Sequence, residues 1–381
     1  MDGKIWRGVQ SLLDAYVRIA GGDTAVILYT SDSQRSAALV CAALEMRAIP
    51  AVRVWMAPLV DETFEVRLRE ALPASDAFTG RLILLSFERD TFSHTGALTR
   101  ALARYPGERL RIFRSISASD SLFADALLAS PDELSRRNVA ILERLTRATQ
   151  LRITTRGGTD LAVTLDPKHR WISNRGRARD GGTVILPAGE VATFPAEISG
   201  IHVADFAYNV NAITDDDVRL EAFPVTIEIE GGRVVAHRCD DARTMRFLDS
   251  ALTTHCAYNV GELGFGTNFC IGEPIAMNSH INERRPGVHL GLGQHNQDPG
   301  VVGYQCAIHL DLIARGGIVE VDGGSDVMDL EHLVPSDLPH PESTRDEDVF
   351  SPDTLQIEDG DCCELLSDGV LTPCPTPSVA A

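Results

Sequence analysis

The sequence predicts an α/β protein with two folded domains: an N-terminal doubly wound domain on a parallel sheet, and a C-terminal α+β, partly barrel-like domain. Short apolar runs alternate with helical patterns up to about residue 150, as strands and crossover helices do in a parallel sheet. Strand-like segments with glycine turns then replace this alternation. At 381 residues the chain is also too long for one ordinary core.

The N-terminal domain is expected over residues 1–150. Four apolar runs have the length of strands buried on both faces; they are TAVILYT, AVRVWMA, RLILLSF and ERLRIFRSI. Helical spacing is found in the segments that begin at Lys4, Ser33, Gly96 and Pro131, and the last of these ends near Gln150. Neither G-x-G-x-x-G nor G-x-x-x-x-G-K-[ST] occurs in this domain, so no nucleotide site is expected.

The second domain is expected over residues 151–324. Its strand-like segments are LRITTRGGTDLAVTLD, GGTVILPAGEVATFPA, FPVTIEIEGGRVVAHR, PGVHLGLG, YQCAIHLDLIA and GIVEVDGG. The third is predicted to be a hairpin that turns at Gly231 and Gly232. RTMRFLDSALTTH is predicted to be a helix that leads into the stretch from Asn259 to Asp311.

Residues 325–381 form a proline-rich, acidic C-terminal extension. Fourteen acidic residues between Asp326 and Asp368, against Arg345 alone, account for 13 of the 19 net negative charges. We expect a flexible or loosely docked segment, or alternatively a small hairpin formed by DTLQIEDGDCCELLSDGVLTPCP on the body. Because the body has no basic face, nucleic-acid binding is not expected.

The cysteine pattern and the lengths of the apolar segments predict where in the cell the protein is found. Eight cysteines are scattered without a C-x-x-C pair, so neither a disulfide framework nor a zinc ribbon is expected. No run of eighteen apolar residues and no basic-then-apolar start is present. We therefore expect a cytoplasmic protein without a membrane segment.

Four residues between Asn259 and Asp311 are candidates for chemistry: Glu262, His289, His309 and Asp311. Each lies beside glycine or in an apolar run, where an unpaired charge would be costly to bury. His309 and Asp311 are two residues apart, which places both side chains on one face of a strand. Glu190, in LPAGEVATFPAE, has similar surroundings.

Taken singly, these residues have ordinary explanations: an ion pair at a strand end, a core histidine, or a glutamate in a solvent-facing turn. Together they supply three carboxylates and two imidazoles. That set could hold two divalent metals that share a bridging carboxylate and a bridging water. Such a pair generates hydroxide near neutral pH and polarises a carbonyl oxygen, as peptide or amide hydrolysis requires.

LPAGEVATFPAE, GELGFGTN, PGVHLGLG after Glu283, and AIHLD resemble, in order and spacing, the signature of metallo-aminopeptidases of the aminopeptidase T type. The resemblance spans residues 1–324 and is specific from Arg156 onward. It implies a dimeric hydrolase that removes an amino-terminal residue from a peptide or cleaves a small amide, using zinc, cobalt or manganese. It also implies five metal ligands, which are Glu190, Glu262, His289, His309 and Asp311.

The sequence departs from this family at two places near the site. The family has a tyrosine shortly after the third-motif histidine, where this chain has His295 and Asn296 in GQHNQ. His295 could replace the tyrosine's hydrogen bond. The family's DEK-like segment is Asn282-Glu283-Arg284 here, and Glu283 is a candidate general base or supporting group. Glu262, Glu283 and His295 are therefore the predicted catalytic residues.

Two other functions are open at this stage. One is ring cleavage by a single Fe(II), because a branch similar to this family includes dihydroxypyridine dioxygenases. His289, His309 and Asp311 would then supply two imidazoles and one carboxylate, although Glu262 stands where that branch has histidine, and one iron would not require Glu190. The other is a non-catalytic peptide-binding protein. The three carboxylates argue against it, because without a metal they would repel one another.

Overall fold

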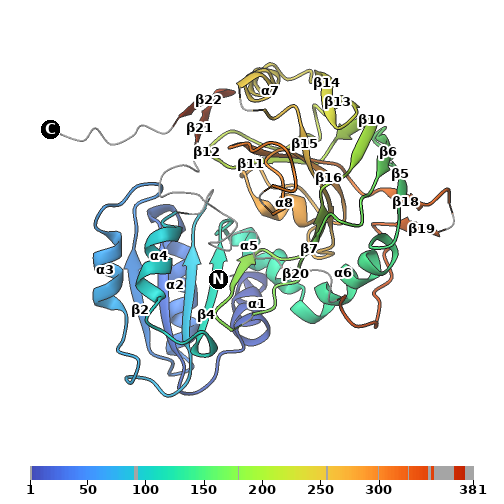
Figure 1. The fold of residues 1–381 in the computed structure, drawn as a ribbon. Coiled ribbons are helices and arrows are strands. Elements are labelled where there is room, and N and C mark those ends of the chain that lie inside the picture. Colours follow the sequence, from blue (N-terminus) through green and yellow to red (C-terminus); the bar gives the residue numbers. More distant parts are fainter. Residues whose placement is uncertain are drawn as a thin grey trace.

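The structure is a computed structural model that describes residues 2–89, 93–178, 180–254, 256–298, 300–324, 326–341, 345–346 and 364–373. An N-terminal α/β part and a larger β-rich part lie side by side (Figure 1). The predicted fold class is confirmed, since one large sheet is parallel and two are built mainly from antiparallel strands. No helix within the described ranges has the length and apolar character needed to cross a bilayer.

The N-terminal part is organised on a five-stranded parallel sheet of order β2-β1-β3-β4-β8. Its strands are β1 (Thr24–Tyr29), β2 (Ala51–Trp55), β3 (Leu82–Phe87), β4 (Leu110–Ser115) and β8 (Thr183–Leu186). The first four correspond to the four predicted apolar runs. The fifth comes from the segment expected in the second domain, so the chain returns to the first sheet after residue 150.

Helices cover both faces of this sheet (Figure 1). Ala25 and Ile27 point to one face and pack with α1, η1 and α2, whereas Val26 and Leu28 point to the other and pack with α3 and α4. This alternation explains why β1 is buried at every position but its last residue. The helices are α1 (Gly3–Ser11), the π-helical η1 (Leu12–Val17), α2 (Gln34–Glu45), α3 (Phe64–Ala71), α4 (Thr95–Leu102) and α5 (Asp120–Ala124).

Helix α6 (Pro131–Leu145) leads from the first sheet into the β-rich part. Ser130 and Glu133 form a capping box at its start, and Pro131 occupies its first turn, a position that needs no N–H donor. The predicted extension of this helix to Gln150 is wrong, because Gln150 is already paired with Thr164 in a sheet.

The β-rich part contains two seven-stranded sheets. One has the order β14-β13-β10-β6-β5-β18-β19 and the other the order β11-β17-β16-β15-β9-β7-β20. Their inner faces enclose the largest apolar core, which includes Ile153, Ile227, Leu263, Leu290 and Leu312. The strands of the first sheet are β5 (Gln150–Thr154), β6 (Asp160–Thr164), β10 (Glu197–Ala204), β13 (Val225–Glu230), β14 (Arg233–Arg238), β18 (Ile318–Val321) and β19 (Asp326–Asp329).

The second of these sheets carries the candidate site. Its strands are β7 (Trp171–Asn174), β9 (Glu190–Thr193), β11 (Ala207–Val210), β15 (Val260–Gly266), β16 (Gly287–Gly293), β17 (His309–Ile313) and the short parallel β20 (Arg345–Asp346). Helix α7 (Ala242–Thr254) precedes β15, and the short α8 (His280–Arg284) lies between β15 and β16. The predicted hairpin at Gly231 and Gly232 is confirmed as β13 and β14.

Part of the acidic extension is docked on the body. Strands β21 (Glu364–Ser367) and β22 (Val370–Pro373) form a hairpin that extends β12 (Ala212–Thr214). Arg243 binds the Asp368 carboxylate at this hairpin's turn, at 2.6 Å. The alternative prediction of a small hairpin is confirmed for these residues, whereas 342–344, 347–363 and 374–381 lie outside the described part of the extension.

A disulfide joins Cys256 to Cys306, whose Cα atoms lie 6.0 Å apart. The expectation that the scattered cysteines form no disulfide is therefore wrong for this pair. The two residues are separated by 50 positions but precede β15 and β17, which both begin at the same end of the sheet. The disulfide thus connects the segments that enter two site-bearing strands.

The disulfide provides a first prediction. Closing a loop of this length restricts the unfolded chain, so Cys306→Ser should lower the free energy of unfolding by about 2–4 kcal/mol. Urea denaturation checks this, with the wild type in excess thiol reductant as the matched control. Reductant should bring the wild type to the stability of the variant and leave the variant unchanged; a wild type insensitive to reductant would contradict the prediction.

Candidate metal centre

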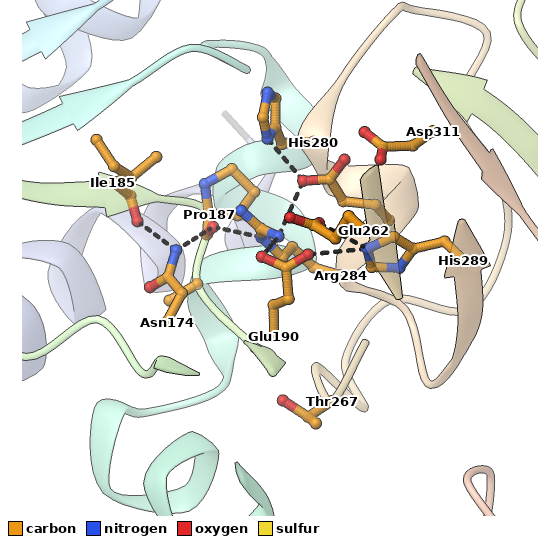
Figure 2. A network of polar contacts seen from close by, with 12 residues as sticks. Asn174, Ile185, Pro187, Glu190, Glu262, Thr267, His280, Arg284, His289 and Asp311 are labelled. Carbon is orange, nitrogen blue, oxygen red and sulfur yellow. Dashed lines mark hydrogen bonds and ion pairs between the residues drawn. The ribbon is translucent and has the colours of Figure 1, made fainter. Parts of the chain in front are cut away.

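Four adjacent strands, β9, β15, β16 and β17, bring together all five of the residues predicted to bind metal. Glu190 begins β9, Glu262 lies in β15, His289 in β16, and His309 and Asp311 in β17. Figure 2 shows Glu190, Glu262, His289 and Asp311 converging above the sheet, next to Arg284 of α8.

Each of these five residues faces a glycine across the sheet. The glycine partners are Gly266 for Glu190, Gly291 for both Glu262 and Asp311, Gly264 for His289, and Gly293 for His309. A Cβ atom at Gly264 would lie 2.0 Å from His289 Nε2. The glycines of GELGFG and GVHLGLG therefore leave the space that the polar side chains occupy.

Two groups of potential ligands share Glu262. Glu190, Glu262 and His289 form one, and Glu262, His309 and Asp311 form the other; within each group the ligand atoms lie within 4.8 Å of one another. His289 Nε2 is 2.9 Å from Glu190 Oε1 and 3.7 Å from Glu262 Oε1. His309 Nε2 is 3.1 Å from Asp311 Oδ1.

The second group likewise depends on a glycine opposite its side chains. A Cβ atom at Gly291 would lie 2.8 Å from His309 Cε1, 2.9 Å from Glu262 Cβ and 3.1 Å from Asp311 Oδ1. Carboxylate oxygen and imidazole nitrogen are ligands for Fe, Mn, Co or Zn. A metal site of Glu, His and Asp residues is therefore present in the geometry, with the side chain of His309, 22% exposed, at its solvent edge.

Arg284 is a cation already in place beside this site. Its side chain is 2% exposed; Nη1 contacts Glu190 Oε2 and lies 2.9 Å from Glu283 Oε1, and Nε donates to Pro187 O at 3.1 Å. Glu283 also accepts from Asn209 and pairs with His280 at 2.7 Å. The guanidinium therefore offsets part of the negative charge of Glu190 and Glu283 on the α8 side of the site.

The remaining charges shift the pKa values of the site residues. Although burial disfavours a charged imidazole, the carboxylates of Glu190 and Glu262 raise the pKa of His289 well above its ordinary value. Asp311 likewise outweighs burial and raises the pKa of His309 to about 10. Burial itself raises the pKa of Asp311 to about 6. Protons thus balance the carboxylates, and a bound metal ion would replace them.

The predicted catalytic residues lie in different surroundings. Burial opposes ionisation of Glu283, but His280 and Arg284 hold its pKa well below the ordinary value, so this carboxylate stays charged. The ring nitrogens of His295 interact with its own loop, at Tyr304 O (3.0 Å) and the Gln297 amide (3.3 Å). Its catalytic role stays a prediction.

Sequence reasoning missed four residues that contact the predicted ligands or Glu283. Asn296 donates to Glu262, Asn209 donates to Asp311, His280 pairs with Glu283, and Arg284 contacts Glu190. Asn296 and Arg284 were identified only as departures from a family pattern. No spacing or motif signals their contacts, because each comes from a loop, a helix or the separate strand β11, which the tertiary fold places beside the site.

Comparison with known families decides between the functions left open by the residues. A family model described as 2,5-dihydroxypyridine 5,6-dioxygenase matches residues 16–270, about two thirds of the chain. The chain belongs to the 2,5-dihydroxypyridine 5,6-dioxygenase family. The matched region includes Glu190 and Glu262 but ends before His289, His309 and Asp311. No curated protein sequence matches this member of the family.

Two solved structures share the fold of this dioxygenase-family chain. The 2,5-dihydroxypyridine dioxygenase of Pseudomonas putida KT2440 has a TM-score of 0.59 and 14% identity, over 90% of this chain and 100% of that one. Wild-type AmpT from Thermus thermophilus has a TM-score of 0.51 and 14% identity, over 85% and 97% of the two chains. The predicted resemblance to aminopeptidase T therefore holds at the level of a distant fold.

The predicted activity as a hydrolase, aminopeptidase, metalloprotease or peptidase is wrong. The family match points to oxidation by a dioxygenase. The error arose because five ligands of the right types were taken to specify the reaction. A donor set that suits several divalent metals does not by itself distinguish hydrolysis from oxygen chemistry.

The glycine pairing provides a second prediction. Gly264→Ala should lower the free energy of unfolding by about 1–3 kcal/mol, because the added methyl group displaces the buried His289 ring. Urea denaturation of the metal-free protein measures this loss. Gly272→Ala is the matched control, since its Cβ would meet nothing within 4 Å. Equal stability of the two variants would show that His289 does not need the space opposite Gly264.

Proposed function

We propose that the chain is a ring-opening dioxygenase that acts on a dihydroxylated pyridine or a close aromatic relative and uses one Fe(II) ion. The observation that carries this proposal is the family match over residues 16–270. The geometry adds a place for the metal, at Glu262, His309 and Asp311. The ligands expected for iron from the sequence were His289, His309 and Asp311. In the structure, Glu262 takes the place of His289 beside His309 and Asp311, and His289 faces Glu190 instead.

The Glu262, His309 and Asp311 group fits a metal ion better than the group around Glu190. The latter already has Arg284 against Glu190, and a metal there would meet the guanidinium charge in a buried environment. By contrast, no arginine or lysine among the described residues is paired with Asp311 or Glu262. We therefore propose one ion in the Glu262–His309–Asp311 group, in place of the two predicted from the set of five ligands.

A ferrous ion bound there would supply the redox centre that activates dioxygen next to an electron-rich ring. The chain's own residues orient this centre. Asn209 donates from one amide nitrogen to Glu283 at 2.9 Å and to Asp311 at 3.3 Å, and so bridges the two carboxylates. Glu283 holds His280 Nδ1 at 2.7 Å, so the His280 ring is fixed at the partly exposed border of the site.

The proposed reaction is a net addition of dioxygen. The ring C5–C6 bond breaks, and each of these carbons receives one atom of the same O₂ molecule, so no external reductant is consumed. The side chains of His309 and His280, 22% and 23% exposed, mark the solvent-facing edge of the site. An aromatic substrate would therefore approach the ion from this edge.

The third prediction tests this function directly. Protein reconstituted anaerobically with Fe(II) should bind about one iron per chain and, on addition of 2,5-dihydroxypyridine and oxygen, consume one O₂ per ring opened. An oxygen electrode and loss of the ring absorbance measure the two quantities together. Asp311→Ala should lose more than 10²-fold in rate because it removes a ligand, while circular dichroism stays unchanged.

Two controls make the assay decisive. Asp326→Ala removes a surface carboxylate outside the site and should leave the oxygen uptake of the protein unchanged. A panel of other dihydroxylated pyridines and benzenes separates a narrower substrate difference from the absence of dioxygenase activity. Oxygen uptake by no member of the panel, in protein that holds iron, would refute the proposed function.

The fourth prediction concerns Arg284. In metal-free protein, Arg284→Met should lower the free energy of unfolding by about 3–5 kcal/mol, because it leaves Glu190 and Glu283 buried without their cation. Added Mn(II) should restore part of this loss by binding the native state and should raise the metal stoichiometry above one. Thermal unfolding and metal analysis measure the two effects.

Arg285→Met is the matched control, since Arg285 pairs with Glu331 away from the site at 2.9 Å. Its stability should not respond to Mn(II) more than that of the wild type. A single bound ion in Arg284→Met would show that the guanidinium does not limit the site to one metal.

The predicted homodimer and the predicted lack of nucleic-acid binding stay predictions. The predicted peptide or amide substrate is not proposed again, because it depended on the hydrolase activity that the family match contradicts.

A further inference from the structure

The loop between β16 and β17 approaches the site through Asn296. Its Nδ2 donates to Glu262 Oε2 at 2.9 Å, and Asn296 is 4% exposed. Glu262 is the only residue shared by both groups of potential ligands in the described part of the chain. The direction in which its carboxylate points therefore decides which group it serves, and Asn296 is a neutral donor fixed to one of its two oxygens.

The orientation of the Asn296 amide is itself set by Gln297. Gln297 Nε2 donates to Asn296 Oδ1 at 2.6 Å, so the nitrogen of the Asn296 amide must face Glu262. A flipped amide would place its oxygen against the carboxylate and lose both hydrogen bonds. Gln297 is 5% exposed, which makes an unsatisfied amide at this position costly.

Arg170, immediately before β7, fixes Gln297 in turn. The Arg170 backbone N–H donates to Gln297 Oε1 at 2.8 Å, and its carbonyl accepts from Gln297 Nε2 at 3.1 Å. The Arg170 side chain donates to Asn296 O at 2.6 Å and to Asp298 at 2.7 Å. Arg170, just before β7, thus holds the three consecutive loop residues Asn296, Gln297 and Asp298.

We propose that Arg170, Gln297 and Asn296 form a positioning relay that fixes the orientation of the Glu262 carboxylate, which the two groups of potential ligands share. The relay deepens the proposed function and rests on it, since Glu262 is taken there as a metal ligand. Asn296 and Gln297 touch neither the ion nor the substrate. They act through Glu262 by limiting the rotation of its carboxylate and by satisfying Oε2.

The fifth prediction uses two variants that break the relay at different points. Asn296→Ala removes the donor, and Gln297→Glu replaces the Nε2 donor with an acceptor, which turns the Asn296 amide around. Both should weaken Co(II) binding about 10–100-fold and change the visible spectrum of the bound Co(II). Anaerobic titration measures both, and circular dichroism of the metal-free proteins should stay unchanged, which shows that the variants keep the fold.

Gln305→Ala, an exposed residue of the same loop, is the matched control and should bind Co(II) as the wild type does. Wild-type affinity and spectrum in Asn296→Ala would overturn the relay while leaving the dioxygenase proposal intact. Loss in Asn296→Ala without loss in Gln297→Glu would overturn the orienting role of Gln297. A wild type that binds no Co(II) or Fe(II) would instead overturn the proposed function on which the relay rests.

Discussion

The site depends on crowding many polar side chains onto one face of a sheet whose other face is packed. Glu190, Glu262, His289 and Asp311 are each at most 7% exposed, and adjacent strands bring them close together. Ordinary residues on the facing positions would fill this space, since cross-strand neighbours lie only about 4.5–5.5 Å apart. A glycine opposite each ligand removes that obstacle, and the apolar residues between the ligands, such as Leu263 and Leu290, continue to the core.

Charge is the second constraint on this arrangement. Buried carboxylates require cations or hydrogen-bond donors, and the chain supplies them unevenly. Arg284 lies against Glu190 and Glu283, whereas Glu262 and Asp311 receive neutral amide donors from Asn296 and Asn209. Neutral donors leave the carboxylate charge available to a metal. Among the five predicted ligands, Glu190 is thus paired with an arginine, whereas Glu262 and Asp311 receive neutral donors.

The local part of this organisation could be predicted from sequence. Apolar runs gave the strands of the parallel sheet, and the two-residue spacing of His309 and Asp311 correctly placed both on one face of β17. What depends on tertiary placement could not be predicted. The return of β8 to the first sheet, the Cys256–Cys306 pair and the contact of Arg284 with Glu190 join segments with no shared local pattern.

The functional error has the same origin. Residue types and spacing specify which atoms can bind a metal, and the geometry brings all five predicted ligands together. Residue types and spacing do not specify how many ions bind or which reaction the ions catalyse, because the number of ions and the reaction depend on the cations and hydrogen-bond donors around the ligands. The fold is shared with both a dioxygenase and AmpT, at TM-scores of 0.59 and 0.51, so the fold does not decide either. Under the proposed function, the guanidinium beside Glu190 favours one ion over two, and a single ion lacks the second Lewis acid of a two-metal hydrolytic site. The charge partners of the ligands, more than the ligands themselves, therefore distinguish the chemistry of this site.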